Sequence, residues 1–123
     1  MAKASSAALD QAKAYGTSAA TLALLAGDAS RAVRTAVGAR TETPAEALAR
    51  LGRDTAMQVR QAVAGNPSAP LETLQVLAED RHELVRLFVA QNASAPPELL
   101  SRLAGDSSQV VARVAPLHPR FPK

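Results

Sequence analysis

The stretch VRQAVAGNPSAPLETL, residues 59–74, decides the fold of this chain. Its first apolar run ends at Gly65-Asn66-Pro67, and a second run starts after Pro70. The stretch VRLFVAQNASAPPELL, residues 85–100, repeats the pattern one step of 26 residues later. Internal similarity at a fixed period of about 20 to 50 residues is typical of repeat proteins. The period is therefore the first property to trace along the chain.

The same step holds along nearly the whole sequence. Each unit has an aspartate at the same place, and these are Asp28, Asp54, Asp80 and Asp106. Rows of leucine and valine keep the step too, and they predict the structural core: Leu22, Leu25, Val33, Leu48, Leu51, Val59, Val63, Leu74, Leu77, Val85, Val89, Leu100, Leu103 and Val111. We divide the chain into a degenerate N-terminal cap helix (1–15), four repeats (16–41, 42–67, 68–93 and 94–117) and a truncated fifth repeat or C-terminal cap (118–123).

The first half of each unit is predicted to be a short helix. In the second repeat it runs from about Pro44 to Arg53. Proline suits the first helical position, where the backbone needs no N–H partner. Thr43 and Glu46 have the spacing of a capping box, in which each side chain accepts a backbone N–H of the first turn.

The second half of each unit is predicted to be another helix. Asp54 is expected to be its N-cap, as are Asp80 and Asp106 in the later units. Gly65-Asn66 is expected to end it in the left-handed conformation, with Pro67 preventing continuation. In the N-terminal cap helix, Ser5 or Ser6 is the expected N-cap, and the small apolar face consists of Ala7, Leu9 and Ala14.

One such unit cannot fold alone. Its few apolar side chains bury too little surface to offset the conformational entropy lost on ordering 26 residues. Neighbouring units must therefore share one continuous core, which defines a solenoid. We predict an all-α solenoid of about four 26-residue, two-helix repeats, each an α-helix plus a shorter α or 3-10 helix, with the second helices lining one face.

The composition excludes several classes of function. There is no cysteine, so the chain can form no disulfide, thiolate zinc site or cysteine nucleophile. No apolar run approaches the roughly 20 residues of a membrane span, and the N-terminus is too polar for a secretory signal. We expect a cytoplasmic protein, and the alanine- and arginine-rich usage suggests a bacterial source. His82 and His118 have no partners at metal-ligand spacing, so we expect no metal and no cofactor.

The positive charge lies at the ends of the chain. The formal net charge is +3, but residues 16–117 contain ten arginines against ten acidic residues. The excess comes from Lys3, Lys13, Arg120 and Lys123, which outnumber Asp10. The repeats themselves are electrically neutral, and this argues against a broad nucleic-acid-binding surface.

The repeated segments resemble the leucine-rich repeat variant family. The resemblance rests on VRQAVAGNPSAPLETLQVLAED (59–80), VRLFVAQNASAPPELLSRLAGD (85–106) and VRTAVGARTETPAEALARLGRD (33–54), and it extends over about residues 17–122. It implies a right-handed superhelix of alternating α and 3-10 helices whose units serve protein interaction. It brings no catalytic residues. One family member, associated with nitrogen fixation, carries a Cys-ligated iron–sulfur cluster, a feature that this cysteine-free chain cannot share.

An arginine row follows the valine row and has two interpretations. Arg34, Arg60 and Arg86 keep the 26-residue step, which Ala112 breaks. As a functional feature, the row would present one guanidinium per unit to phosphates or to an acidic partner. As a structural feature, each arginine lies six residues after an aspartate and can join adjacent units through an Arg–Asp ladder.

The segment HELVRLF, residues 82–88, also has two interpretations. Leu87 stands where the other units have Thr35, Gln61 and Arg113, so an exposed leucine here would mark a partner or dimer surface. Alternatively, Leu84, Leu87 and Phe88 thicken the core of one unit.

The pattern as a whole favours a non-enzymatic protein–protein interaction scaffold. No Ser–His–Asp grouping, phosphate-binding glycine loop or close carboxylate pair is apparent. The alternative is a weak nucleic-acid-binding repeat protein that uses the arginine row. We expect a protein partner, with self-association through the C-terminal repeat face as a further possibility, and no membrane partner. The candidate interaction surface consists of Arg34, Met57, Arg60, Gln61, Leu84, Arg86, Leu87 and Arg113.

Overall fold

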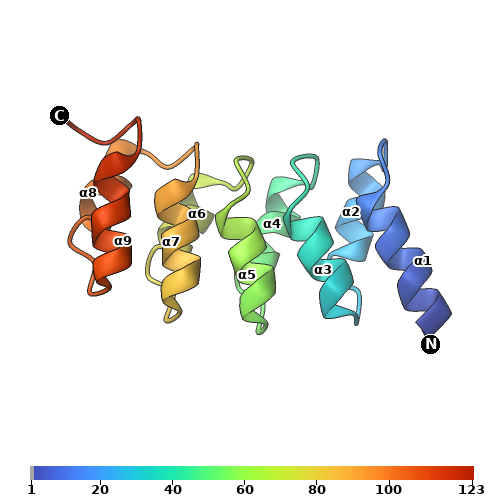
Figure 1. Ribbon diagram of the computed structural model, residues 1–123. Helices are drawn as coiled ribbons and strands as arrows, with labels where there is room; N and C mark the ends of the chain where they lie inside the picture. The colour runs from blue at the N-terminus through green and yellow to red at the C-terminus, as the bar shows by residue number, and fades with distance from the viewer. Residues whose placement is uncertain (1) are drawn as a thin grey trace.

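The computed structural model describes residues 2–123, which form a curved stack of helices (Figure 1). No strand occurs in this range. None of the helices within it is long and apolar enough to cross a membrane. The α-helices are α1 (Ala2–Lys13), α2 (Ala19–Leu25), α3 (Arg31–Gly38), α4 (Ala45–Leu51), α5 (Met57–Ala64), α6 (Leu71–Leu77), α7 (Glu83–Gln91), α8 (Pro97–Leu103) and α9 (Gln109–Val114), followed by the 3-10 turn η1 (Ala115–Leu117).

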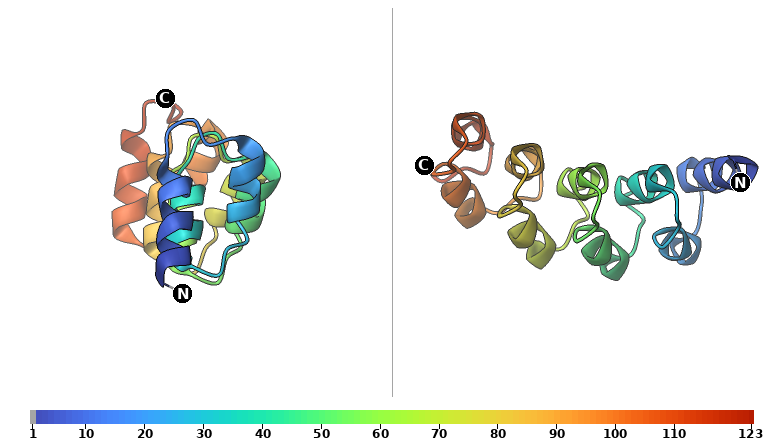
Figure 2. Two further views of the ribbon diagram at one scale, coloured as in Figure 1. Left: turned by 90° about the vertical axis from the view of Figure 1, so that its right-hand side faces the viewer. Right: turned by 90° about the horizontal axis from the view of Figure 1, so that it is seen from below.

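The helices form two rows. Helices α1, α3, α5, α7 and α9 pack side by side in one row, and α2, α4, α6 and α8 form the other. The first row lies on the concave side of the curve (Figure 2, right). The predicted all-helical solenoid is therefore confirmed. Of the two alternatives for the shorter helix of each unit, the structure has the α-helix: both helices of every described unit are α, and the one 3-10 turn among the described residues is η1.

The core lies between the two rows. Each predicted core leucine and valine is buried except Leu25, which is half-buried and packs against the same cluster. Small residues let consecutive units approach closely. A Cβ atom added to Gly52 would lie 2.8 Å from Cγ2 of Thr73, so any larger residue at position 52 would push α4 away from α6.

The second helix of each unit starts two residues later than predicted. The N-cap residues are Ser30, Ala56, His82 and Ser108, not the preceding aspartates. Each aspartate instead accepts a hydrogen bond from the N–H group two residues on, as Asp54 does from Ala56 at 2.9 Å. This local turn is a common use of Asp side chains, and it moves the start of the helix beyond the aspartate.

The first helix also begins differently. Pro44, Pro70 and Pro96 were predicted to be the first helical residues but are N-cap residues. Each helix therefore begins one residue later than predicted. The capping box is wrong as well, because the Thr43 hydroxyl donates to the carbonyl of Val37 at 2.7 Å and is buried there. A buried hydroxyl that satisfies the end of α3 contributes more than one that caps an exposed turn.

The N-terminal end differs from prediction in its N-cap and in its apolar face. Helix α1 begins at Ala2, so neither Ser5 nor Ser6 is its N-cap. Ala7 and Ala14 are exposed, whereas Ala12 is buried and Leu9 is half-buried, because α1 packs on α3 as a second helix would. At the other end, His118 starts a turn in which the Arg120 N–H donates to Nδ1 of His118 at 3.0 Å.

Candidate functional site

The arginine row is tied into the structure by an Arg–Asp ladder. The Nε groups of Arg34, Arg60 and Arg86 donate to the aspartate of the next unit, at 2.8 Å to Asp54, 2.7 Å to Asp80 and 2.9 Å to Asp106. A second guanidinium nitrogen of each arginine donates to the other carboxylate oxygen. The third reaches the carbonyl of the aspartate six residues earlier, so each arginine joins two units. We call these six residues the Asp edge.

The ladder also lowers the pKa of two of its aspartates. Burial alone would raise the pKa of Asp80, but hydrogen bonds from Arg60 and from the His82 N–H, together with the charge of Arg60, hold that pKa below its ordinary value. The pKa of Asp54 is lowered in the same way, because Arg34 and the Ala56 N–H outweigh the effect of burial. Both carboxylates are therefore ionised partners at neutral pH.

The Asp edge leaves little of the arginine row for a ligand. The side chains of Arg34, Arg60 and Arg86 are 19%, 8% and 13% exposed. Every guanidinium already has a carboxylate and a carbonyl as acceptors. The structure thus places these three predicted surface residues within the repeat interfaces. A phosphate could bind there only by breaking the contacts between units.

An amide ladder runs along the opposite edge of the stack. The Nδ2 group of Asn66 donates to the carbonyls of Gly38 and Arg40, both at 2.8 Å. Asn92 repeats this contact with Ala64 and Asn66 at 2.7 and 2.9 Å. Gly65-Asn66 therefore does not end the helix in the left-handed conformation; of the described residues only Gly16 has positive φ. Asn66 is at this position because its amide satisfies the end of the preceding α3.

The amide ladder continues at both ends with other side chains. Arg40 occupies the asparagine position in the first unit, and its guanidinium donates to the carbonyls of Ala12 and Ala14 at 2.8 Å. His118 occupies it at the C-terminal end, where Nε2 lies 2.7 Å from the carbonyl of Asn92. We call Arg40, Asn66, Asn92 and His118 the Asn edge.

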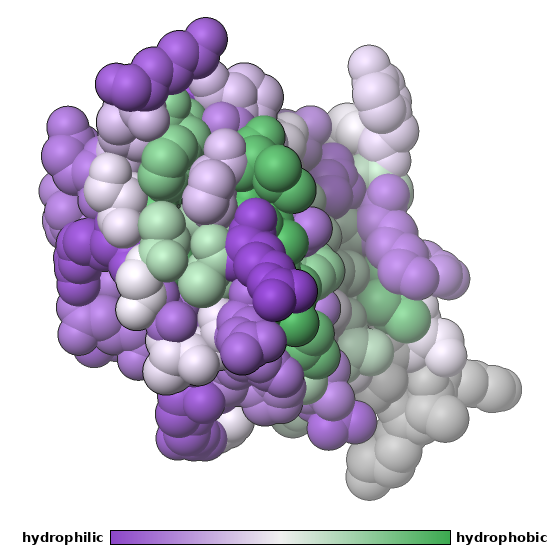
Figure 3. Space-filling view, turned by 60° about the vertical axis from the view of Figure 1, so that its left-hand side comes forward, coloured by the Kyte–Doolittle hydropathy of each residue, from purple (hydrophilic) through white to green (hydrophobic). Residues whose placement is uncertain are grey.

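The concave row presents different surfaces at its two ends. Over α3 and α5 its outward positions, apart from the exposed Arg31 at the start of α3, are small or uncharged and polar: Ala32, Thr35, Ala36, Gln58, Gln61 and Ala62. Over α7, α9 and η1 they form what we call the apolar patch: Leu84, Leu87, Phe88, Val110, Val114 and Leu117. Leu84 is 39% exposed, Val110 is 53% exposed and Leu117 is 79% exposed. Apolar side chains gather in a strip at this end of the molecule, with hydrophilic side chains beside it (Figure 3).

Two depressions follow the seam between α7 and α9. One of about 120 Å³ is lined by Glu83, Leu84, Leu87, Val110 and Val111. The other, of about 330 Å³, is lined by residues of α7 and of the segment after α9, namely Ala90, Gln91, Val114, Leu117, His118 and Pro119. The patch is therefore a groove with two hollows rather than a flat surface.

Comparison with known families explains the repeats. Residues 59–117 match the Leucine Rich Repeat Variant domain. These residues, just under half of the chain, are similar to that domain. The match runs from α5 through η1 and contains the whole apolar patch. Comparison with curated proteins and with solved structures found no match. The resemblance predicted from the sequence is thus confirmed, and repeat domains of this family are often involved in protein interaction.

The remaining predicted surface residues have mixed positions. Leu84 and Arg113 are exposed, whereas Met57, Gln61 and Leu87 are half-buried. Leu87 packs against the core and is also partly accessible, so it both thickens the core and contributes to the surface. Phe88 lies over α5, where a Cβ atom on Gly65 would approach its ring to 3.0 Å.

Sequence reasoning missed four residues of the patch, Phe88, Val110, Val114 and Leu117, as surface candidates. Their signal was present, because Val114 and Phe88 stand where the first two repeats have alanine, and Leu117 stands where they have Ala39 and Gly65. The larger apolar residues at the position of Phe88 and Val114 in the last two units are visible only when all four units are aligned. No three His, Cys, Asp or Glu side chains within residues 2–123 gather as a metal site would require.

Proposed function

We propose that this leucine-rich repeat variant domain is a non-enzymatic scaffold that binds a protein partner on its concave row. The observation that carries the proposal is the apolar patch over α7, α9 and η1, which is exposed although the rest of the row is polar or small. Exposed apolar groups gathered on one face of a protein mark an interaction site more often than scattered ones do.

The charged groups of the repeats support a binding role rather than catalysis. The aspartates and arginines of the Asp edge bind one another. Both histidines use a ring nitrogen to accept a backbone N–H, His82 from Leu84 and His118 from Arg120. An active site needs such groups free to meet a substrate. We therefore propose that the domain acts by binding alone.

The proposal is tested by capture with matched variants. Wild-type protein, Leu84→Asp/Val110→Asp and Leu71→Asp/Val76→Asp are immobilised, and proteins retained from a lysate of the source organism are identified. Leu71 and Val76 lie on α6 in the convex row with 47% and 40% exposure, close to the values for Leu84 and Val110. A partner of the concave row is retained by the wild type and by the α6 variant but is lost from the first variant. Equal retention by all three proteins would contradict the proposal.

Nucleic-acid binding is the alternative function, and the formal net charge of +3 is the observation that favours it. Because the arginine row is paired within the stack, only scattered exposed arginines such as Arg31, Arg53 and Arg113 and the basic chain ends would remain for phosphates. Two or three such contacts give weak, strongly salt-dependent binding. We expect no binding of a labelled oligonucleotide below about 10 µM at low salt, and fluorescence anisotropy measures this directly. Light scattering at high protein concentration tests self-association through the C-terminal repeat, which stays a prediction.

A further inference from the structure

We infer that the groove between α7 and α9 binds an acidic amphipathic helix of the partner, whose apolar side chains enter the two hollows while its carboxylates face Arg113 and the basic C-terminal segment. This inference rests on the proposed function and adds the chemistry of the partner. It follows from the lining of the groove, from the charges beside it and from the kind of backbone that can lie in it.

The lining of the groove requires apolar side chains from the partner. The lower hollow is formed chiefly by Leu84, Leu87 and Val110, and the upper one by Val114, Leu117 and Pro119 beside Gln91. The two hollows lie along the length of α7, which spans nine residues. At about 1.5 Å of rise per residue, that length is about 13 Å, or two to three helical turns. A partner helix would reach both hollows with side chains at positions i, i+4 and i+7 on one face.

The charges beside the groove select an acidic partner. Arg113 is exposed on α9, which forms one wall, and Arg120 directly follows Pro119, which lines the upper hollow, whereas residues 107–123 contain no Asp or Glu. Asp106 itself is paired with Arg86. The outward positions over the adjacent α5 carry no charge, so nothing on that side opposes a negative ligand. Glu83 is the one acidic residue that lines the two hollows, and its carboxylate accepts the hydroxyl of Ser108 at 2.6 Å. Electrostatic complementarity of this kind steers encounter and excludes partners of the wrong charge.

The walls of the groove favour a helix over an extended strand. Both walls are α-helices, whose backbone N–H and C=O groups bond within each helix. They offer no free edge to which a strand could add main-chain hydrogen bonds. A helix satisfies its own backbone and needs only side-chain contacts, as in other complexes in which a helix lies in a groove. A second copy of this chain fits the groove less well. If the convex row of one copy lay in the groove of the next, the contact would be head-to-tail and would give open filaments rather than a closed oligomer.

The test uses an unbiased peptide library. Full-length protein is panned against phage-displayed random 16-residue peptides, with Leu84→Asp/Val110→Asp protein as the counter-selection. Enriched peptides should combine apolar residues at helical spacing with at least two Asp or Glu. For the synthetic form of the most enriched peptide, Arg113→Glu should weaken binding about tenfold or more in fluorescence anisotropy. The control Arg53→Glu, an exposed arginine beside the convex row, should change it less than twofold.

The outcomes separate this inference from the proposed function. Enrichment of basic or uncharged peptides, or no effect of Arg113→Glu, would overturn the acidic partner while leaving a binding scaffold. Peptides that bind the groove variant equally well would overturn the groove itself. A dimer in sedimentation that the groove variant dissociates would replace the partner helix with a second copy. If the library yields no binder and the capture experiment also retains nothing, both proposals fail together. Circular dichroism and thermal unfolding confirm that each variant is folded.

Discussion

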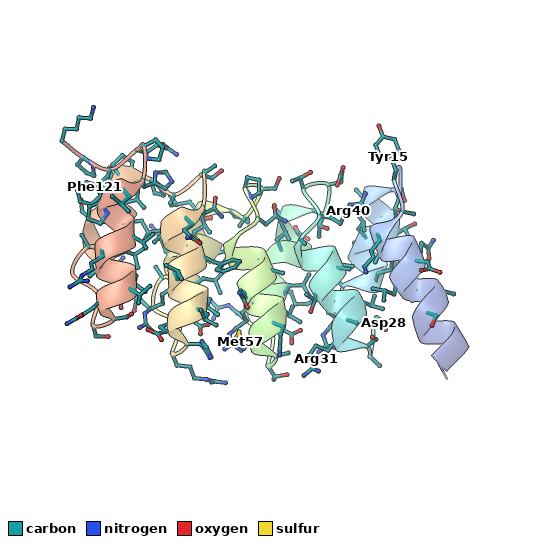
Figure 4. The ribbon with its side chains drawn as sticks, in the orientation of Figure 1. Tyr15, Asp28, Arg31, Arg40, Met57 and Phe121 are labelled. Carbon is teal, nitrogen blue, oxygen red and sulfur yellow. The ribbon has the colours of Figure 1, made fainter. Side chains whose placement is uncertain are left out.

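The two edges of the stack join the same repeats by different chemistry. On the Asp edge, each link is an ion pair between a guanidinium and a carboxylate 20 residues apart. On the Asn edge, each link runs from a side-chain donor to backbone carbonyls 26 and 28 residues earlier. In Figure 4, Arg40 of the Asn edge lies near the upper loops, and Asp28, whose carbonyl accepts from Arg34 of the Asp edge, lies near the lower loops.

The difference shows which link tolerates change. The Asn edge needs only a donor that reaches a carbonyl, so Arg40 and His118 can replace asparagine at its ends. The Asp edge needs two matched charges, so it stops where a partner is lacking. Ala112 stands in the place of the next arginine, and Ala8 in the place of the preceding one. A half-buried charge without its partner is costly. At Asp28, which Ala8 leaves without an arginine, the carboxylate keeps a hydrogen bond from the Ser30 N–H at 2.8 Å.

The largest effect is expected from Arg60→Ala. Arg60 is 6% exposed, and its removal leaves the carboxylate of Asp80 half-buried without its charge partner. We expect the free energy of unfolding to fall by about 3–5 kcal/mol, measured by urea denaturation. The control is Arg102→Ala, which breaks the exposed pair with Glu79 and should cost no more than about 1 kcal/mol. Equal losses for the two variants would remove the distinction between the Asp edge and an ordinary surface pair.

A somewhat smaller loss is expected from Asn92→Ala on the other edge. This change leaves the carbonyls of Ala64 and Asn66 without their donor and the Ser94 N–H without its acceptor. Since each unsatisfied buried group costs about 1–3 kcal/mol, and part of this is recovered by water, we expect a loss of about 2–3 kcal/mol in the same denaturation experiment. Asn92→His keeps one donor, as His118 does, and should lose less. If Asn92→Ala and Asn92→His lowered the free energy of unfolding equally, hydrogen bonding would not be the reason that this position repeats every 26 residues.

Acid should weaken only one of the two edges. The folded state lowers the pKa of Asp54 and Asp80 below the value of about 3.9 that an unfolded Asp has. Their contribution to stability is therefore complete above about pH 5 and is lost as the pH falls through the lowered folded-state pKa values. We expect the urea midpoint to drop between pH 5 and pH 2.5. In Asp54→Asn/Asp80→Asn the starting stability is lower and the drop is smaller, and an unchanged drop would place the acid sensitivity elsewhere.

The smallest effect is expected at the C-terminal end of the Asn edge. His118→Asn restores the residue that the inner units use, so the free energy of unfolding should stay within about 1 kcal/mol of the wild type. His118→Ala removes the contact with the Asn92 carbonyl and should cost about 0.5–1.5 kcal/mol, the usual net value of one hydrogen bond. Thermal unfolding of the two variants in parallel measures the difference. A larger loss for asparagine than for alanine would mean that the imidazole ring packs rather than bonds.

The sequence by itself determined the period, the two helices of each unit and the core rows. These follow from burial, which leaves its mark on every unit as leucine or valine at the same place. The six-residue spacing of Asp and Arg also suggested the ladder as one of two interpretations. The apolar patch was partly readable, since Leu87 departs from its row, but Leu117 was not recognised.

Only the tertiary structure decided which groups bind one another. Asp54 is a turn residue rather than an N-cap, and Thr43 bonds to Val37 rather than to its own helix. Asn66 satisfies carbonyls of the preceding unit rather than ending a helix in the left-handed conformation. The physical reason is distance along the chain. A hydrophobic row records only whether a residue is buried, whereas a hydrogen bond between residues 20 to 28 apart depends on how far one unit is rotated and shifted against the next.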